Sequence, residues 1–195
     1  MDQIILATNN DHKTKEFKKI FNQFGIEIKS LKDVNISIDI EETGSTFFEN
    51  SLIKAEAIRK FTALPILADD SGLVIPELNN EPGVYSARYA GLYATDEENR
   101  QKVLKKVVDT KLNKPSAYFA CALTLLTEKA VQVEGHCNGF ILTEERGENG
   151  FGYDPIFCLK GTDTSLAELT ETEKNRVSHR AHAIALLLEK LNLTK

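Results

Sequence analysis

Two carboxylates and a hydroxyl stand together where an apolar segment reaches a glycine. Residues 64–74 read LPILADDSGLV, so Asp69, Asp70 and Ser71 directly precede the glycine. Acidic side chains at the end of a strand in an open α/β sheet are placed to hold a cation or to activate water. Asp, Ser and Gly are also common turn residues, and the triplet taken alone favours a turn. If strand geometry continues through both acids, they point to opposite faces and only one performs the chemistry.

A second polar cluster lies near the N-terminus, where a predicted strand meets a predicted helix. Residues 8–13 read TNNDHK. Main-chain N–H groups at a helix N-terminus, together with Lys13, are suited to binding an anion. The segment lacks the glycines of a phosphate-binding loop, so taken alone it is also typical of an ordinary helix start.

A third cluster pairs acidic residues with a predicted helix that carries an amide and a lysine. Residues 41–44 read EETG, and Asn50 and Lys54 share a helix face because they are four residues apart. Carboxylates at a strand end suit Mg²⁺, which prefers one or two protein carboxylates together with water and phosphate oxygens. Solvated surface acids explain the same residues equally well.

A fourth cluster combines glycines, aromatic rings and hydrogen-bond donors. Residues 150–155 read GFGYDP, and Lys174, His179 and Arg180 follow later in the chain. Glycines that flank an aromatic residue let a planar ligand approach the main chain, and a base can stack on the ring. Donors from His179 and Arg180 suit a keto oxygen on such a base. In the alternative, the aromatic residues belong to the core. A metal site at the two histidines of 179–182 lacks further ligands.

The elements that must position these clusters alternate between strands and helices. Apolar runs and alternating patterns predict strands at 3–8, 26–28, 34–40, 118–127, 131–134, 140–142 and 155–159. Helical spacing predicts a helix that ends near Gly25 and a last helix that contains 177–191, and T-x-x-E capping boxes at 46–49 and 95–98 open two others. Together these elements predict an α/β fold with a mixed central sheet flanked by helices, and two lobes around an active-site cleft.

Length and composition describe one globular domain over residues 1–195. Of 195 residues, 42% are hydrophobic and 27% are charged, which is typical of a soluble domain with a sizeable core. No apolar run approaches the roughly 20 residues that span a bilayer, and we expect no signal peptide, no membrane partner and a cytoplasmic location. The net charge of −5 argues against binding to nucleic acid. Three widely spaced cysteines predict reduced thiols in the core.

The four clusters occur in an order that resembles the inosine triphosphate pyrophosphatase family, and its bacterial members in particular. The motifs that carry the resemblance are TNN with Lys13 at 8–13, EETG at 41–44, FEN with Lys54 at 48–54, ADDSGL at 68–73, YSARY at 85–89, GFGYDP at 150–155, and EK with SHR at 173–180. They cover essentially the whole chain. The main departure is Asn9, where many members have glycine, and asparagine tolerates positive φ better than most residues.

The resemblance implies an enzyme that hydrolyses inosine, xanthosine and deoxyinosine triphosphates to the monophosphate and pyrophosphate. It also implies a Mg²⁺ requirement, a homodimer, and a long central sheet with the site between two lobes. By match of motif, Glu41 and Asp70 hold the metal, and Asp70 accepts a proton from water. The implied substrate-binding residues are Thr8, Asn9, Asn10, Asp11, His12, Lys13, Lys54, Ser71, Phe151, Gly152, Tyr153, Asp154, Lys174, His179 and Arg180.

The implied chemistry is physically coherent. Hydrolysis between the α and β phosphates requires neutralisation of the leaving pyrophosphate, which lysines and Mg²⁺ provide. A metal-bound carboxylate is a weak base, so we expect Asp70 to orient water and to accept its proton late. Donors aimed at the purine 6-position admit a keto base and reject adenine. Two alternatives stay open: a phosphatase with an aspartate nucleophile, for which the usual Asp-x-Asp spacing is missing, and a non-catalytic purine nucleotide sensor.

Overall fold

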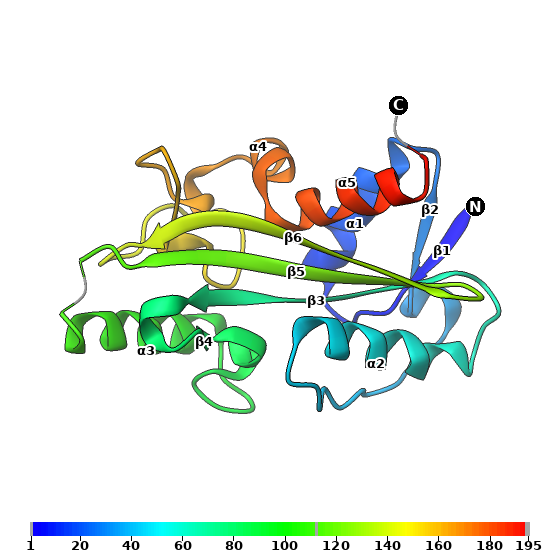
Figure 1. The fold of residues 1–195 in the computed structure, drawn as a ribbon, viewed down its shortest axis with the longest axis horizontal. Coiled ribbons are helices and arrows are strands. Elements are labelled where there is room, and N and C mark those ends of the chain that lie inside the picture. The colour runs from blue at the N-terminus through cyan, green and yellow to red at the C-terminus, as the bar shows by residue number, and fades with distance from the viewer. Residues whose placement is uncertain (1, 112, 194–195) are drawn as a thin grey trace. The chain divides into compact units, whose positions relative to one another are not determined.

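The computed structural model describes residues 2–111 and 113–193 (Figure 1). Within these residues, helices and strands alternate in the first part of the chain, and three successive strands and two helices follow from residue 116. The helices are α1 (Asp11–Asn22), α2 (Phe47–Arg59), α3 (Asp96–Asp109), α4 (Glu171–Val177) and α5 (His179–Lys190). The strands are β1 (Gln3–Leu6), β2 (Glu27–Ser30), β3 (Ile66–Ile75), β4 (Glu81–Pro82), β5 (Ser116–Leu126), β6 (Ala130–Ile141) and β7 (Phe157–Leu159).

Within the described residues, the strands form a seven-stranded sheet in the order β2-β1-β3-β5-β6-β7, and β4 pairs with β3. Strand β1 lies parallel to both β2 and β3. The pairs β3–β4 and β6–β7 are antiparallel. The sheet is therefore mixed, which confirms the predicted α/β class.

Contacts divide the described residues into two compact units. Unit 1 comprises Met1–Asp70, Cys121–Gly135 and Arg180–Lys195, and unit 2 comprises Ser71–Ala120 and His136–His179. Strands β3, β5 and β6 contribute residues to both units, and each unit has its own apolar core. The single domain over 1–195 and the cleft between lobes stay predictions, and the two units are described separately below.

In unit 1 the two faces of β3 pack against different helices. Leu67 belongs to a cluster built with α1 and α5. Ile66 and Ala68 belong to a second cluster built with α2. Successive residues of a strand point to opposite faces, so this alternation fixes the side on which each later residue of β3 emerges.

Side chains define where the helices begin. Thr46 accepts from Glu49 N in front of α2, and Thr95 accepts from Glu98 N in front of α3; each glutamate reaches back to the main chain of its threonine. These are the two capping boxes that the sequence predicts. Residues within the first turn therefore determine where α2 and α3 begin.

Five predicted elements differ in the structure. Residues 34–40 do not form a strand; their isoleucines pack against the α2 cluster from an irregular segment. The strands expected at 131–134 and 140–142 are one continuous strand, β6. The last helix is two helices, because Ser178 is extended with ψ of 153°. Helix α1 ends at Asn22, before the turn at Gly25, which has φ of +71°.

The three cysteines are buried free thiols, which confirms the prediction made from their spacing. Among the residues that the structure places, no helix combines the length and the apolar character needed to cross a membrane.

Candidate active site

Asp69 and Asp70 leave β3 on opposite faces, as the pleat predicts. The strand continues through both residues, so this segment is not the turn that the triplet taken alone favours. Asp69 contacts Lys13 of α1, and Asp70 contacts Asn50 of α2. The two carboxylates therefore belong to different clusters.

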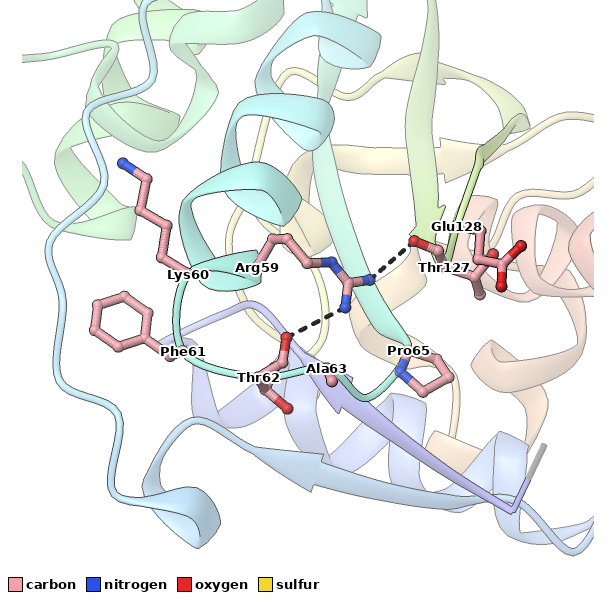
Figure 2. Close-up of a pocket in the computed structure, with 8 residues that line it drawn as sticks. All are labelled: Arg59, Lys60, Phe61, Thr62, Ala63, Pro65, Thr127 and Glu128. Carbon is pink, nitrogen blue, oxygen red and sulfur yellow. Dashed lines mark hydrogen bonds between the residues drawn. The ribbon is translucent and has the colours of Figure 1, made fainter.

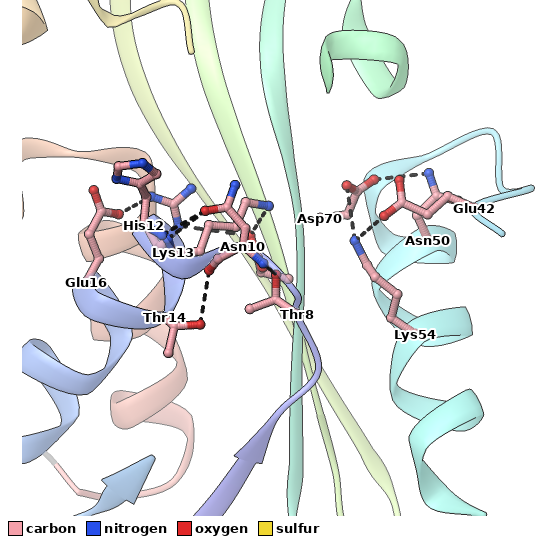
Figure 3. A network of polar contacts seen from close by, with 12 residues as sticks. Thr8, Asn10, His12, Lys13, Thr14, Glu16, Glu42, Asn50, Lys54 and Asp70 are labelled. Carbon is pink, nitrogen blue, oxygen red and sulfur yellow. Dashed lines mark hydrogen bonds and ion pairs between the residues drawn. The ribbon is translucent and has the colours of Figure 1, made fainter. Parts of the chain in front are cut away.

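Two side chains of α2, one helical turn apart, hold Asp70 (Figure 3). Asn50 Nδ2 donates to Asp70 Oδ2 at 3.0 Å, and Lys54 Nζ donates to Asp70 Oδ1 at 3.4 Å. Lys54 Nζ also donates to Glu42 Oε1 at 2.7 Å, so the ammonium bridges two carboxylates. Asn50 Oδ1 accepts from Gly44 N at 2.8 Å. A Cβ at Gly44 would lie 2.6 Å from that oxygen, so only glycine allows this approach to α2.

Burial and neighbouring charges both shift the pKa values in this cluster. Burial raises the pKa of Asp70 above its ordinary value; Lys54 opposes the rise and Glu42 adds to it. Burial alone would lower the pKa of Lys54, but the neighbouring carboxylates, above all Asp70, raise it. A cation beside Asp70 would stabilise the charged carboxylate, which is the electrostatic condition for a divalent metal.

The carboxylate of Asp70 is an oxygen ligand of the kind that Mg²⁺ prefers. Across 2–111 and 113–193, no group of three or more His, Cys, Asp or Glu side chains is arranged to hold a metal ion. Mg²⁺ does not need such a group, because it binds one or two carboxylates and completes its shell with water and phosphate oxygens. Glu42 is already paired with Lys54, whereas Glu41 is exposed to solvent. The predicted metal role of Glu41 stays a prediction.

A second buried charge cluster surrounds Asp69 on the α1 side. Lys13 Nζ lies 2.7 Å from Asp69 Oδ2, and Arg180 Nε lies 3.9 Å from the same oxygen. Arg180 is only 1% exposed and also pairs with Glu16 of α1. Burial opposes ionisation of Asp69, but the neighbouring cations, above all Lys13, lower its pKa to about 2. Asp69 is therefore ionised and holds Lys13 and Arg180 in place.

The N-terminus of α1 is capped by a side chain of the TNNDHK segment. Asn10 Oδ1 accepts from the N–H groups of His12 and Lys13 at 2.9 and 3.0 Å. Thr8 Oγ1 accepts from Asn10 N at 3.2 Å. Two of the N–H groups expected to bind an anion are thus occupied by Asn10. The cationic side chain of Lys13 is paired with Asp69, and its role toward a phosphate stays a prediction.

The other two residues of that segment point elsewhere. Asn9 Nδ2 donates to Ile38 O at 3.3 Å. Asn9 is not among the residues with positive φ, so asparagine in place of the family glycine introduces no backbone strain. Asp11 pairs with Lys32 at 2.8 Å, and both side chains are largely exposed.

In unit 2, the segment 150–154 folds around the carboxylate of Asp154. Asp154 Oδ2 accepts from Phe151 N at 2.8 Å and from Lys174 Nζ at 2.7 Å. Lys174 Nζ lies 4.5 Å from the centroid of the Phe151 ring. Gly150 has φ of +80°, and a Cβ there would lie 2.2 Å from Asp154 Oδ2. Glycine is therefore required at 150, and the predicted residues Phe151, Asp154 and Lys174 form one contact group.

Two further predicted residues are buried in unit 2. Tyr153 is 5% exposed, packs in the apolar core and donates its hydroxyl to Ser86 O at 2.7 Å. The His179 ring stacks on Phe119, with 4.8 Å between the ring centroids. The alternative that placed the aromatic residues of this segment in the core holds for Tyr153, whereas Phe151 is half-buried.

The predicted site residues are shared between the two units. Unit 1 contains 8–13, Glu41, Lys54, Asp70 and Arg180; unit 2 contains Ser71, 151–154, Lys174 and His179. Glu42 and Asn50 belong to the third cluster predicted from the sequence but were not assigned as binding residues, and Glu16 was not singled out. The structure places all three in the unit 1 clusters. Helical spacing was the available signal, since Glu16 lies three residues after Lys13 and Asn50 four residues before Lys54.

A pocket of about 610 Å³ lies elsewhere in unit 1 and contains none of the predicted site residues (Figure 2). It is lined by Arg59, Lys60, Phe61, Thr62, Ala63, Pro65, Thr127 and Glu128. Arg59 donates to four main-chain carbonyls, those of Thr62, Leu64, Leu126 and Thr127. The guanidinium thus ties the end of α2 to the β5–β6 turn, and its role is structural.

Known proteins resemble this chain over nearly its full length. A model of the Ham1 family matches residues 4–190. The chain is 48% identical over 189 residues to a Bacillus subtilis protein named dITP/XTP pyrophosphatase, and the match covers 96% of each chain. The protein of that name from Halalkalibacterium halodurans is also 48% identical over 189 residues, with 96% of this chain and 97% of the relative covered.

Solved structures also resemble this fold over nearly the full length of the chain. The HAM1 protein of Coxiella burnetii gives a TM-score of 0.89 at 42% identity, with 100% of both chains covered. The Ham1 protein of Staphylococcus aureus gives a TM-score of 0.86 at 40% identity, with 97% of this chain and 98% of the other covered.

Proposed function

The chain belongs to the Ham1 family, and on that premise we propose that it hydrolyses inosine, deoxyinosine and xanthosine triphosphates to the monophosphate and pyrophosphate. Such an enzyme removes abnormal purines from the nucleotide pool. The observation that carries the proposal is the 48% identity, over 96% of both chains, to a protein named dITP/XTP pyrophosphatase. The family resemblance inferred from the motifs is thereby confirmed.

Asp70 is the group proposed to act on the attacking water. Its carboxylate is buried and is held by Asn50 and Lys54, so it can orient water and accept a proton late in the reaction. Mg²⁺, held by Asp70 and Glu41, would neutralise phosphate charge and polarise the water. Lys13 and Lys54 supply cationic side chains for the triphosphate, and each is kept in place by an aspartate.

The purine end of the nucleotide is assigned to the half-buried Phe151 ring and to hydrogen-bond donors. Lys174, His179 and Arg180 are the donors proposed for a base with a keto oxygen at the 6-position. The amino group of adenine would face another donor, and an unpaired buried donor costs about 1–3 kcal/mol. Adenine nucleotides are therefore expected to be poor substrates.

Three further properties complete the proposal. The enzyme requires Mg²⁺, forms a homodimer and works in the cytoplasm. The resemblance to the family supports all three, and the chemistry of the Asp70 and Glu41 carboxylates supports the first. A purine nucleoside triphosphate is the expected ligand, with no nucleic acid and no membrane partner.

One assay separates this function from its alternatives. Purified protein is incubated with Mg²⁺ and, in turn, ITP, XTP, dITP, GTP and ATP, and pyrophosphate and orthophosphate are measured separately. Pyrophosphate released from ITP, XTP and dITP, with little from ATP, is the expected result. Release of orthophosphate would indicate a phosphatase, and binding of ITP without turnover would indicate a sensor.

A further inference from the structure

Helix α3 holds the segment 150–154 through the main chain of a single residue. Gly152 N donates to Asp96 Oδ2 at 2.7 Å, and Arg100 Nη1 donates to Gly152 O at 2.9 Å. Asp96 and Arg100 are four residues apart and therefore share one face of α3. Each bond has one charged partner, which makes it stronger than a bond between neutral groups.

The conformation of this segment depends on such an external hold. Gly150 and Gly152 have φ of +80° and +61°, and glycine loses more conformational freedom on ordering than any other residue. The bonds inside the segment close around Phe151, whose N–H donates to Asp154 Oδ2 and whose carbonyl accepts from Asp154 N at 3.2 Å. The polar groups of Gly152 are instead satisfied by α3.

The helix that provides the hold is itself firmly placed in unit 2. Its first turn is closed by the Thr95–Glu98 capping box, and Val103 and Val107 are buried in the unit's core. Arg100 has a second partner, because its Nε lies 3.1 Å from Glu145 Oε2. The Arg100 side chain is 14% exposed, and its guanidinium lies between Gly152 O and the Glu145 carboxylate.

We propose that Asp96 and Arg100 are positioning residues for substrate binding. They fix Gly152 and, through it, the conformation in which Phe151 and Lys174 are presented to the base. The inference rests on the proposed function, which assigns 151–154 to the purine end of the nucleotide. Asp96 and Arg100 act on this segment and not on Asp70, so their loss should change KM much more than kcat.

The test compares Asp96→Ala and Arg100→Met with conservative and control variants. Loss of one charge-assisted hydrogen bond corresponds to about 10- to 100-fold in an equilibrium constant, so we expect KM for ITP to rise by about that factor. We expect kcat to stay within about threefold, since the groups around Asp70 are untouched. Asp96→Asn keeps an acceptor and Arg100→Lys keeps a donor, and both should recover most of the loss. Glu145→Gln removes the other partner of Arg100 and should leave KM within about twofold.

Hydrogen exchange of the peptide that covers 147–156 gives an independent readout. In Arg100→Met this peptide should exchange faster than in the unaltered protein, while peptides from α2 exchange at the same rate. Unchanged KM in both Asp96→Ala and Arg100→Met, or a fall in kcat at constant KM, would overturn the proposal. If Asp96→Ala or Arg100→Met unfolds, the other of these two variants still tests the split between KM and kcat, because each removes a separate bond to Gly152.

Phe151→Ala separates this inference from the function on which it rests. If Phe151→Ala raises KM but Arg100→Met does not, the hold by α3 is refuted and the assignment of the segment to substrate stands. If Phe151→Ala leaves KM unchanged, the segment does not bind the base and the inference fails with that assignment. A rise in KM for both variants, with recovery in Arg100→Lys, supports both.

Discussion

The buried pair between Glu16 and Arg180 gives a stability prediction whose size follows from burial. Glu16 is 7% exposed and Arg180 is 1% exposed, so Glu16→Gln leaves a guanidinium charge in the interior. Removal of one partner from a buried pair costs roughly 3–5 kcal/mol. Arg180 keeps a contact with Asp69 at 3.9 Å, and glutamine still accepts a hydrogen bond, so we expect a loss of about 2–3 kcal/mol.

The assay is urea unfolding, with the free energy of unfolding extrapolated to water. The matched control is Lys32→Met, which breaks the pair with Asp11, whose two side chains are 69% and 68% exposed. That pair is hydrated and screened, and its loss should cost under about 1 kcal/mol. Equal losses in the two variants, or a loss below about 1 kcal/mol in Glu16→Gln, would refute the reasoning from burial.

Three further predictions concern the metal, a thiol and the end of α2. Glu41→Gln should raise the Mg²⁺ concentration for half-maximal ITP hydrolysis by about tenfold or more, and Glu42→Gln should change it by less than about threefold; the reverse order in a Mg²⁺ titration would contradict the assignment. Burial raises the pKa of Cys137 from 9.0 to about 11. Iodoacetamide at pH 8 should therefore label this thiol only after unfolding, and the stability that the neutral thiol contributes should fall as the pH rises from about 9 to about 11. Arg59→Met breaks four hydrogen bonds and should lower the free energy of unfolding, measured in urea, by about 2–4 kcal/mol. KM for ITP should stay within about twofold. A large rise in KM would show that the nearby pocket takes part in binding.

Helix starts whose capping residues lie close together in the sequence could be predicted from the sequence. Thr46 with Glu49, and Thr95 with Glu98, satisfy N–H groups within four residues of one another. Helices α2 and α3 therefore begin where the capping boxes predict. The same locality explains the division of Asp69 from Asp70, since a period of two residues is a property of any strand.

Elements that depend on a distant neighbour could not be predicted in the same way. Residues 34–40 alternate because one side is buried against the α2 cluster, and alternation does not reveal whether another strand pairs with the main chain. The separate strands expected at 131–134 and 140–142 place Gly139 in the connection between them. A Cβ there would lie 2.1 Å from Cys158 O. Gly139 therefore lies inside the continuous strand β6 and allows β7 to pair closely with it.

In the candidate site too, local contacts could be predicted from the sequence and contacts with distant residues could not. Motif spacing identified Asp70, Lys54 and Lys13, whose partners lie on the adjoining helices and strand. Glu16 was missed because its role depends on Arg180, 164 residues further along the chain. Asp96 was missed because it accepts from the main-chain N–H of Gly152. Every residue except proline carries this N–H group, so the sequence does not show which one a side chain will contact.

The rate of pyrophosphate release from ITP by Asp70→Asn tests the central claim most directly. The amide keeps an acceptor for Asn50 but cannot take a proton, so the fold should persist, as checked by urea unfolding, while kcat falls by about 100-fold or more. A folded Asp70→Asn variant that retains most of its kcat would contradict the assignment of Asp70 as the group that acts on water.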